Sequence, residues 1–187
     1  MVRLFGAIAA GLCLILTAGC AEAGIPAAKP ADTVLNPRIV VKKAERTLAL
    51  YDGEKLVAVY PIGLGFTPEG HKKREGDGAT PEGEYTICTR NEKSKFYKSL
   101  GLSYPNAEDA EAGLADGLID EATYKRIVKS IEDMQCPPWN TPLGGEIFIH
   151  GHGAGSDWTA GCIALGDADM EALWQRCQIG TPVTIYP

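Results

Sequence analysis

Short runs of β-branched and aromatic residues, separated by turn residues, dominate the first half of the chain. Runs of this length with Gly, Pro and Asp between them are typical of strands in one sheet. The Asp52-Gly53 pair separates two of the runs and is a strong hairpin signal. The predicted strands span residues 38–42, 47–51, 55–60, 84–88, 146–150 and 182–186.

A stretch with helical periodicity interrupts the strand pattern. Asn106 follows a proline and can cap a first helix, and Asp120 can cap a second. In the second segment apolar side chains recur every three or four positions, at Tyr124, Ile127, Ile131 and Met134. We therefore predict a helical insertion over residues 106–140, which forms a lid or one wall of a cleft.

A third helix is expected near the C-terminus. Asp167 can cap it, and its apolar positions fit one helix face at Met170, Leu173, Trp174 and Cys177. The elements together predict a β-rich α+β fold. Its sheet is mixed or antiparallel and sandwich- or barrel-like, with the helical insertion beside it and the C-terminal helix after Cys162.

The N-terminus carries a segment that is typical of export. Arg3 precedes an apolar run over residues 4–16, and small residues follow up to Cys20, which is the order found in secretory signal peptides. The run is shorter than the roughly 20 residues of a membrane span, and a retained anchor helix is the alternative. Residues 16–20 resemble a bacterial lipobox in which Cys20 becomes lipidated, whereas residues 21–23 offer an ordinary signal-peptidase site.

These features divide the chain into a signal peptide over residues 1–19, a tether over 20–37 and a catalytic domain over 38–187. With 45% hydrophobic and 22% charged residues, the 187-residue chain has the composition of a soluble globular protein. Its net charge of −6 comes with no extended basic face, so a nucleic-acid partner is excluded. We expect contact with a membrane only through the N-terminal lipid, and localisation in the cell envelope.

Candidate chemistry lies in the last third of the chain. His150 ends an apolar strand, and Cys162 follows Gly161 twelve residues later. An imidazole at a strand end can take the proton of a nearby thiol, which produces the thiolate nucleophile. Backbone N–H groups at Gly161 and Cys162 are natural donors to a tetrahedral oxyanion.

The residues around this pair resemble a known active-site signature. Residues 147–151, with sequence Ile-Phe-Ile-His-Gly, and residues 157–164, with sequence Asp-Trp-Thr-Ala-Gly-Cys-Ile-Ala, are similar to the signature of L,D-transpeptidase catalytic domains. Residues 78–85 resemble the family's TPxGxY segment, and residues 90–106 resemble its substrate-side stretch. The resemblance implies a peptidoglycan-modifying enzyme with Cys162 as nucleophile and His150 as base, oriented through the Gly151 carbonyl.

The resemblance also suggests residues that contact the substrate. These are Arg90, Tyr104, His152, Trp158 and Thr159. Many relatives carry Arg two residues after the Cys, where this chain has Ala164, so any contact to a substrate carboxylate must come from elsewhere. The candidates for that contact are Arg90, Lys93, Lys95 and Lys98.

A zinc site is an alternative use of the same residues, since His150, His152 and Cys162 are possible ligands. A catalytic zinc needs three protein ligands and an open position, and His71 lies in a distant loop. We therefore expect neither a metal nor another cofactor.

Export would place the remaining cysteines, Cys88, Cys136 and Cys177, in an oxidising compartment, with room for at most one disulfide and one spare thiol. Cys177 lies on an apolar helix face and is expected as a buried free thiol. Connectivity cannot be read from sequence. If a disulfide forms, the pairing we favour is Cys136–Cys177.

The resemblance implies a reaction in which Cys162 attacks the bond between a diamino acid and D-Ala in a peptidoglycan stem tetrapeptide. A thioester forms and is transferred to an amine, which belongs to another stem peptide or to an envelope protein. One alternative resolves the same thioester with water, as an L,D-carboxypeptidase, endopeptidase or amidase. A different class is a non-catalytic lipoprotein that binds the envelope, against which the intact His150, Gly161 and Cys162 argue.

Overall fold

The computed structural model describes Met1 and residues 33–187. The predicted signal peptide, the lipobox cysteine Cys20 and most of the tether lie outside the described residues. Among the helices that are described, none is long and apolar enough to cross a membrane.

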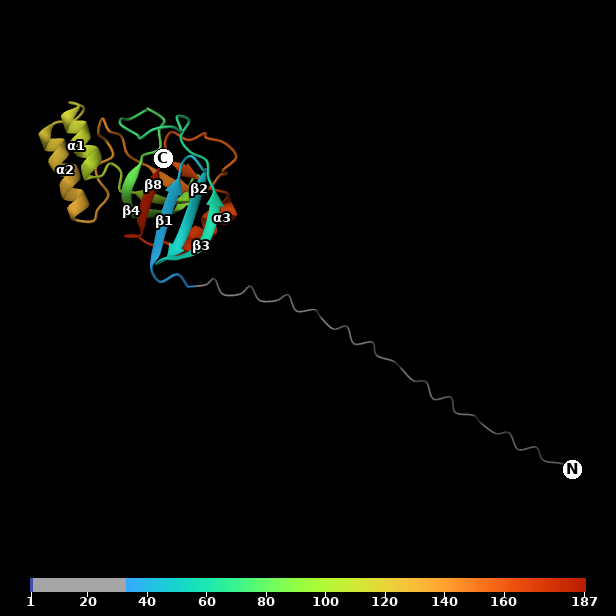
Figure 1. Ribbon diagram of the computed structural model, residues 1–187. Helices are drawn as coiled ribbons and strands as arrows, with labels where there is room; N and C mark the ends of the chain where they lie inside the picture. Colours follow the sequence, from blue (N-terminus) through green and yellow to red (C-terminus); the bar gives the residue numbers. More distant parts are fainter. Residues whose placement is uncertain (2–32) are drawn as a thin grey trace. The chain divides into compact units, whose positions relative to one another are not determined.

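One mixed sheet of eight strands forms the body of the domain, in the order β3-β2-β1-β8-β4-β5-β6-β7 (Figure 1). The pairs β1–β8 and β6–β7 are parallel, and the other neighbouring strands are antiparallel. The predicted β-rich α+β class is therefore confirmed. The strands are β1 (Pro37–Lys42), β2 (Thr47–Asp52), β3 (Lys55–Pro61), β4 (Gly83–Ser94), β5 (Tyr97–Leu102), β6 (Phe148–His150), β7 (Ile163–Ala164) and β8 (Pro182–Tyr186).

Alternation along the strands builds the core. Leu48 and Leu50 of β2 are fully buried, whereas Ala49 between them is not, because successive side chains of a strand point to opposite faces. The same cluster takes in Ile149 of β6, Ile163 of β7 and the apolar face of the C-terminal helix. The short strands that carry the candidate chemistry are thus fixed against the core of the domain.

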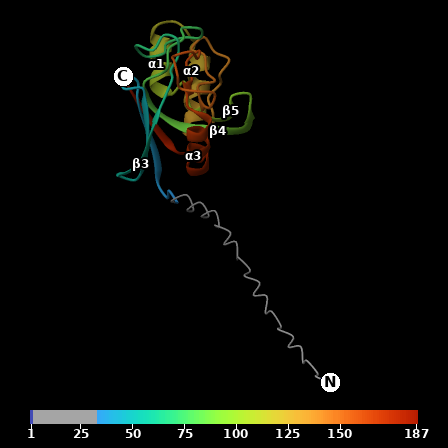
Figure 2. The same cartoon turned by 90° about the vertical axis from the view of Figure 1, so that its right-hand side faces the viewer.

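Within residues 33–187 three helices accompany the sheet: α1 (Ala107–Ala115), α2 (Glu121–Glu132) and α3 (Asp167–Arg176). The pair α1 and α2 lies together at one end of the sheet (Figure 1), and α3 packs against β5. Figure 2 shows the β4–β5 hairpin extending to one side. The predicted helical insertion and C-terminal helix are confirmed.

The helix ends match the sequence prediction in two cases and correct it in a third. Asn106 caps α1 with a capping box, and the Asp120 side chain accepts the Thr123 N–H at the start of α2. Asp167 was the predicted cap of α3, but Gly166 occupies that position without a side-chain bond. The Asp167 carboxylate instead accepts the His152 N–H at 2.8 Å.

The apolar face of α2 is narrower than predicted. Ile127 is fully buried in a small second core with Ala110, Ile119 and Leu143. Met134 lies beyond the end of the helix and is exposed, so it contributes nothing to this core.

The disulfide prediction was wrong. Cys88 of β4 is bonded to Cys136, 48 residues later, and Cys177 is a fully buried free thiol. Cys177 ends α3 on the core side, so its apolar position keeps it away from Cys136. The disulfide ties the end of the helical insertion to the middle of the sheet.

Candidate active site

Strands β6 and β7 bring His150 and Cys162 to one face of the sheet. In their parallel register Ile149 lies opposite Ile163 and His150 lies opposite Ala164. Ile149 and Ile163 face the core, so His150 and the residue before β7, Cys162, face the other side. With neighbouring strands about 4.8 Å apart and about 3.3 Å between residues, the two Cα atoms are about 8 Å apart, within reach of both side chains.

The His150 imidazole is buried and held in one orientation. Its Nδ1 lies 2.6 Å from the Gly151 carbonyl oxygen, the contact expected from the sequence. Because a carbonyl only accepts, Nδ1 carries the proton and Nε2 is left as the basic nitrogen. Phe96 stacks on the ring at 4.7 Å and Trp158 meets it edge-on at 5.6 Å.

Burial governs the acidity of both members of the pair. It lowers the pKa of His150 below its ordinary value despite the opposing bond to Gly151. Burial also raises the pKa of the Cys162 thiol, although the bond from the Phe148 N–H opposes this. Both shifts favour uncharged forms. The two shifts therefore favour a protonated thiol on Cys162 and a neutral imidazole on His150.

Backbone groups hold the sulfur of Cys162. The Phe148 N–H donates to Sγ at 3.4 Å. The thiol in turn donates to the Glu146 carbonyl oxygen, which lies 3.5 Å from Sγ. Glu146 has a φ of +53°, a conformation uncommon for residues with a side chain. This backbone turn aims the Glu146 carbonyl at the thiol.

The loop before the cysteine is fixed by Thr159. Its buried hydroxyl accepts the Gly161 N–H at 3.1 Å and donates to the Cys162 carbonyl at 2.7 Å. Thr159, predicted as a substrate contact, thus has its hydroxyl engaged within the loop. The Gly161 N–H, a predicted oxyanion donor, is held by Thr159 in this structure.

Close backbone packing supports the same loop from behind. Gly161 has a φ of +133°, and a Cβ there would lie 2.7 Å from the Ala79 carbonyl oxygen. Ala79 belongs to the segment that resembles the TPxGxY motif, and the buried Thr80 hydroxyl accepts the Gly65 N–H. The motif therefore contributes a backbone platform beneath the nucleophile loop.

Asp157, two residues before Thr159, ties the same loop to the segments that follow β1 and β3. Its carboxylate accepts three bonds from the Arg46 guanidinium and one from the Leu64 N–H, at 2.8 to 3.1 Å. Burial opposes the ionised form, but these bonds and the Arg46 charge outweigh it and lower the pKa of Asp157. Asp157 and Thr159 thus hold the second half of the loop between His150 and Cys162.

A cavity of about 550 Å³ opens beside Cys162. Its walls come from three parts of the chain: the loop after β3, the segment that follows the disulfide, and the nucleophile loop. The residues that line it are Lys72, Glu75, Gly76, Trp139, Asn140, Gly144, Gly145, Glu146, Ile147, Ala160 and Cys162. Of these, sequence reasoning singled out only Cys162 as functional.

Two predicted substrate contacts are placed elsewhere. Arg90 stacks on Trp174 at 3.9 Å and donates to the Trp174 carbonyl and to Gln178. Tyr104 is 1% exposed and donates to the Leu143 carbonyl. The Arg90 side chain is thus engaged by the C-terminal helix and a residue beyond it, and the Tyr104 side chain is enclosed in the core.

The other basic candidates lie on the β4–β5 hairpin. Lys98 pairs with Glu171 at 2.7 Å, and Lys95 lies 5.0 Å from the Phe96 ring. His152 is exposed beside the same ring, and Trp158 is partly exposed. His152 and Trp158 thus border the His150 side of the site. Within residues 33–187 no three His, Cys, Asp or Glu side chains are grouped so as to hold a metal.

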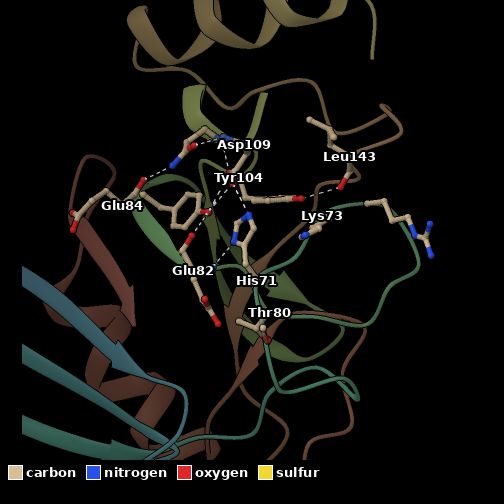
Figure 3. Close-up of polar contacts among 12 residues, drawn as sticks. His71, Lys73, Thr80, Glu82, Glu84, Tyr104, Asp109 and Leu143 are labelled. Carbon is tan, nitrogen blue, oxygen red and sulfur yellow. Dashed lines mark hydrogen bonds and ion pairs between the residues drawn. The ribbon is translucent and has the colours of Figure 1, made fainter. Parts of the chain in front are cut away.

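The loop that carries Lys72 is anchored to α1 through His71 (Figure 3). His71 Nδ1 accepts the Glu82 N–H at 2.9 Å, so its other nitrogen carries the proton and donates to Asp109 at 3.0 Å. Asp109 also accepts from Tyr85 and from the Asn106 N–H. His71 therefore helps to position one wall of the cavity. Both of its ring nitrogens are engaged, one by the Glu82 N–H and the other by Asp109.

Part of the chain is similar in sequence to a curated bacterial protein. YafK of Escherichia coli strain K12, provisionally named an L,D-transpeptidase, is 36% identical over 81 residues, which cover 40% of this chain and 33% of YafK. The chain thus spans about a third of the length of the curated relatives it matches.

Solved structures share the fold at low sequence identity. The L,D-transpeptidase of Xylanimonas cellulosilytica (residues 123–326) has a TM-score of 0.50 at 13% identity, with 83% of this chain and 62% of that chain covered. The helical cell shape determining protein Pgp2 of Campylobacter jejuni has a TM-score of 0.52 at 21% identity, with 82% and 51% covered.

A family model matches nearly all of the described domain. The YkuD model, which represents the L,D-transpeptidase catalytic domain, covers residues 36–185. That range includes every strand and helix of the sheet domain from β1 to β8 except the outermost residue of β8. The chain therefore belongs to the L,D-transpeptidase catalytic domain family.

Proposed function

We propose that this protein is a peptidoglycan L,D-transpeptidase with Cys162 as the acylated nucleophile. The observation that carries the proposal is the arrangement of His150 and Cys162 on one face of β6 and β7. The His150–Gly151 contact leaves Nε2 as a base on that face, and a cavity large enough for a peptide segment opens at the sulfur.

The proposed reaction has two halves. Nε2 of His150 takes the Sγ proton while Sγ attacks the carbonyl carbon that joins the diamino acid to D-Ala. The tetrahedral adduct collapses, the C–N bond breaks, and the imidazolium returns the proton to the departing D-Ala amine. An acceptor amine then attacks the thioester carbonyl, loses a proton to Nε2, and releases the thiol.

Electrostatics of the site favour concerted proton transfer over a stored ion pair. A thiolate with an imidazolium would need two charges in a buried position, which burial disfavours in both groups. The base therefore acts when substrate arrives, and Gly161 N–H contributes to the oxyanion site once the bond to Thr159 opens.

The closest rival keeps the thioester and resolves it with water, as a carboxypeptidase, endopeptidase or amidase. The outcome depends on whether an amine reaches the thioester before water. Export to the cell envelope and a lipid on Cys20 belong to the same proposal, since stem peptides lie outside the cytoplasmic membrane. Acceptors are then neighbouring stem peptides or envelope proteins.

The test is incubation of the purified domain with stem tetrapeptides and analysis of protein and products by mass spectrometry. Release of D-Ala and a thioester on Cys162 are expected, with crosslinked peptides as the second product. Cys162→Ala should abolish both while the circular dichroism spectrum is kept. An adduct on Cys177 in folded protein would contradict the assignment of Cys162 as nucleophile. Tripeptide as the sole product would contradict the assignment as a transpeptidase.

A further inference from the structure

The carboxylate of Glu171 on α3 holds the tip of the β4–β5 hairpin, against which α3 packs (Figure 2). Its Oε2 accepts the Tyr97 hydroxyl proton at 2.6 Å and pairs with the Lys98 ammonium at 2.7 Å. Its Oε1 accepts the Gln175 amide at 3.0 Å. These bonds, that from Lys98 foremost, lower the pKa of Glu171 to about 2. The carboxylate is therefore ionised and fully engaged near neutral pH.

Tyr97 needs such support because of its backbone conformation. Its φ is +71°, in the left-handed region that residues with a side chain rarely adopt. A residue in this region persists only where surrounding contacts hold it there. The bond from the Tyr97 hydroxyl to Glu171 and the ion pair of the next residue, Lys98, are two such contacts. Glu171 thereby fixes the backbone that places the preceding residue, Phe96.

The hairpin tip packs directly against the base of the candidate active site. Phe96 stacks on the His150 ring, with centroids 4.7 Å apart. The Gly151 N–H donates to the Lys98 carbonyl at 3.4 Å, and the Gly151 carbonyl accepts the Nδ1 proton of His150. A Cβ at Gly151 would lie 2.9 Å from Tyr97 Cβ and 3.1 Å from the Phe96 carbonyl oxygen. The tip therefore contacts both the ring and the residue that orients it.

The same helix also holds the loop that follows His150. Asp167 Oδ1 accepts the His152 N–H at 2.8 Å, and it would lie 2.5 Å from a Cβ at Gly151. Asp167 and Glu171 are four residues apart in α3, so their carboxylates lie on one face of the helix. Helix α3 thus connects the hairpin tip to the segment that carries the base.

We propose that Glu171 is a positioning residue for the base: it holds the hairpin tip so that Phe96 keeps water from the His150 ring. Glu171 lies outside the lining of the cavity at Cys162, so it acts through Phe96 and not on a substrate. A loosened hairpin would expose the ring, and the pKa of His150 would rise toward its ordinary value of about 6.5. The effect on acylation rests on the proposed function, whereas the effect on His150 can be measured without turnover.

The direction of the change separates positioning from a direct effect of charge. Removal of the Glu171 charge alone would weaken the attraction for an imidazolium and lower the pKa of His150, whereas exposure of the ring raises it. The charged and titratable groups in the segments packed around His150 are His152 and Cys162 from the nucleophile loop, Lys95, Tyr97 and Lys98 from the hairpin, and Asp167 and Glu171 from α3.

The first experiment follows the histidine ring protons of the purified protein by NMR as pH is varied. The chain has three histidines, and the His150 signal is the one that His150→Ala lacks. Glu171→Ala should raise the pKa of His150. Asp169→Asn is the matched control, because it removes a carboxylate from the first turn of the same helix whose charge acts on Tyr60 of β3. It should leave the titration of His150 in place.

The pH dependence of thioester formation on Cys162 gives a second readout. At about pH 6, Glu171→Ala should be slower than wild type by about threefold or more, with a smaller loss at about pH 8. Combination with Phe96→Ala should shift the acid limb no further than Phe96→Ala alone, because the two residues act in series. Tyr97→Phe, which removes one bond to Glu171, should shift the limb in the same direction by less, and it serves should Glu171→Ala fail to fold.

The two readouts keep this inference apart from the proposed function. Absence of any thioester in the wild-type protein would overturn the proposed function, while the NMR titration would still test Glu171. A pKa of His150 that stays in place or falls in Glu171→Ala would overturn the positioning role. Equal changes in Glu171→Ala and Asp169→Asn would also overturn it, because the effect would then belong to the charge of the helix.

Discussion

Phe96 stacks on the His150 imidazole, with ring centroids 4.7 Å apart and planes inclined by 24°. Phe96 lies at the end of the β4–β5 hairpin, more than fifty residues before the histidine it covers. The contact excludes water from one face of the base. It links the position of a hairpin to the acidity of His150, whose pKa is lowered chiefly by burial.

Phe96→Ala should therefore change the pH dependence of acylation. His150 accepts a proton only in its neutral form, so acylation is lost as pH falls through its pKa. Exposure of the ring raises that pKa toward its ordinary value, and the acid limb moves to higher pH. The measurement is the rate of thioester formation against pH. Lys93→Ala on the same hairpin is the control, and an acid limb that stays in place would refute the role of Phe96.

The two histidines next to the nucleophile should differ strongly. His150→Ala is expected to slow acylation about 100-fold or more, the usual effect of losing a positioned base. His152→Ala should have a much smaller effect, because His152 is exposed and packs edge-on against Phe96. Single-turnover rates with one stem peptide compare them directly. Near-normal rates for His150→Ala would transfer the role of base to another group.

Local sequence patterns were sufficient for six of the eight strands in residues 33–187 and for both helix caps of the insertion, whereas β5 and β7 were not predicted. The same patterns selected His150 and Cys162 as candidate reactive residues. Each depends on neighbours in the chain: alternation for strands, Asn106 and Asp120 before helices, and a glycine beside each reactive residue. The resemblance to the family added the roles of these residues.

The cavity lining and the disulfide could not be predicted in this way. Lys72, Trp139 and Glu146 come from distant segments, and only the folded chain places them around Cys162. Arg90 and Tyr104 were predicted as substrate contacts from a stretch of sequence. In the structure the Arg90 guanidinium stacks on Trp174, and the Tyr104 side chain is buried. Long-range partners of this kind leave no periodic signal.

Lys43 is a second residue whose role could not be predicted from the sequence. Its buried ammonium bonds the Gly70 and Thr80 carbonyls and Glu82, and so closes the loop that carries Lys72. In the sequence Lys43 simply follows a predicted strand in a pair of lysines. A buried lysine is recognisable only from the partners that compensate its charge.

Asp157→Asn should destabilise the fold at neutral pH by about 1 to 2 kcal/mol, after allowance for the partial exposure of its Arg46 partner. Because the folded pKa of Asp157 is lowered, its contribution is present above the unfolded pKa and is lost as pH falls through the folded value. Urea unfolding of both proteins at neutral and acid pH measures this. The difference between them should shrink in acid, and a constant difference would contradict the ion-pair account.

Removal of the Cys88–Cys136 disulfide should weaken the wall of the cavity. A closed loop of 48 residues corresponds to a stabilisation of about 4 kcal/mol in the chain-entropy description. Cys88→Ala with Cys136→Ala is expected to lower Tm and to raise KM, since Trp139 and Asn140 follow the bridge directly. Thiol labelling of native protein should modify Cys162 alone. Labelling of Cys88 or Cys136 without reductant would show that the bridge is absent.

Gly161 and Gly153 offer a matched pair for the nucleophile loop. Both have positive φ, +133° and +107°, but a Cβ at Gly161 would meet the Ala79 carbonyl at 2.7 Å, whereas nothing lies within 4 Å at Gly153. Gly153→Ala therefore costs only backbone strain, about 1 to 3 kcal/mol, and should keep acylation. Gly161→Ala adds a clash that displaces Cys162 from its contacts with Phe148 and Glu146, so acylation should fall at least tenfold further. Equal losses in the two variants would show that the platform formed by Ala79 does not position the nucleophile.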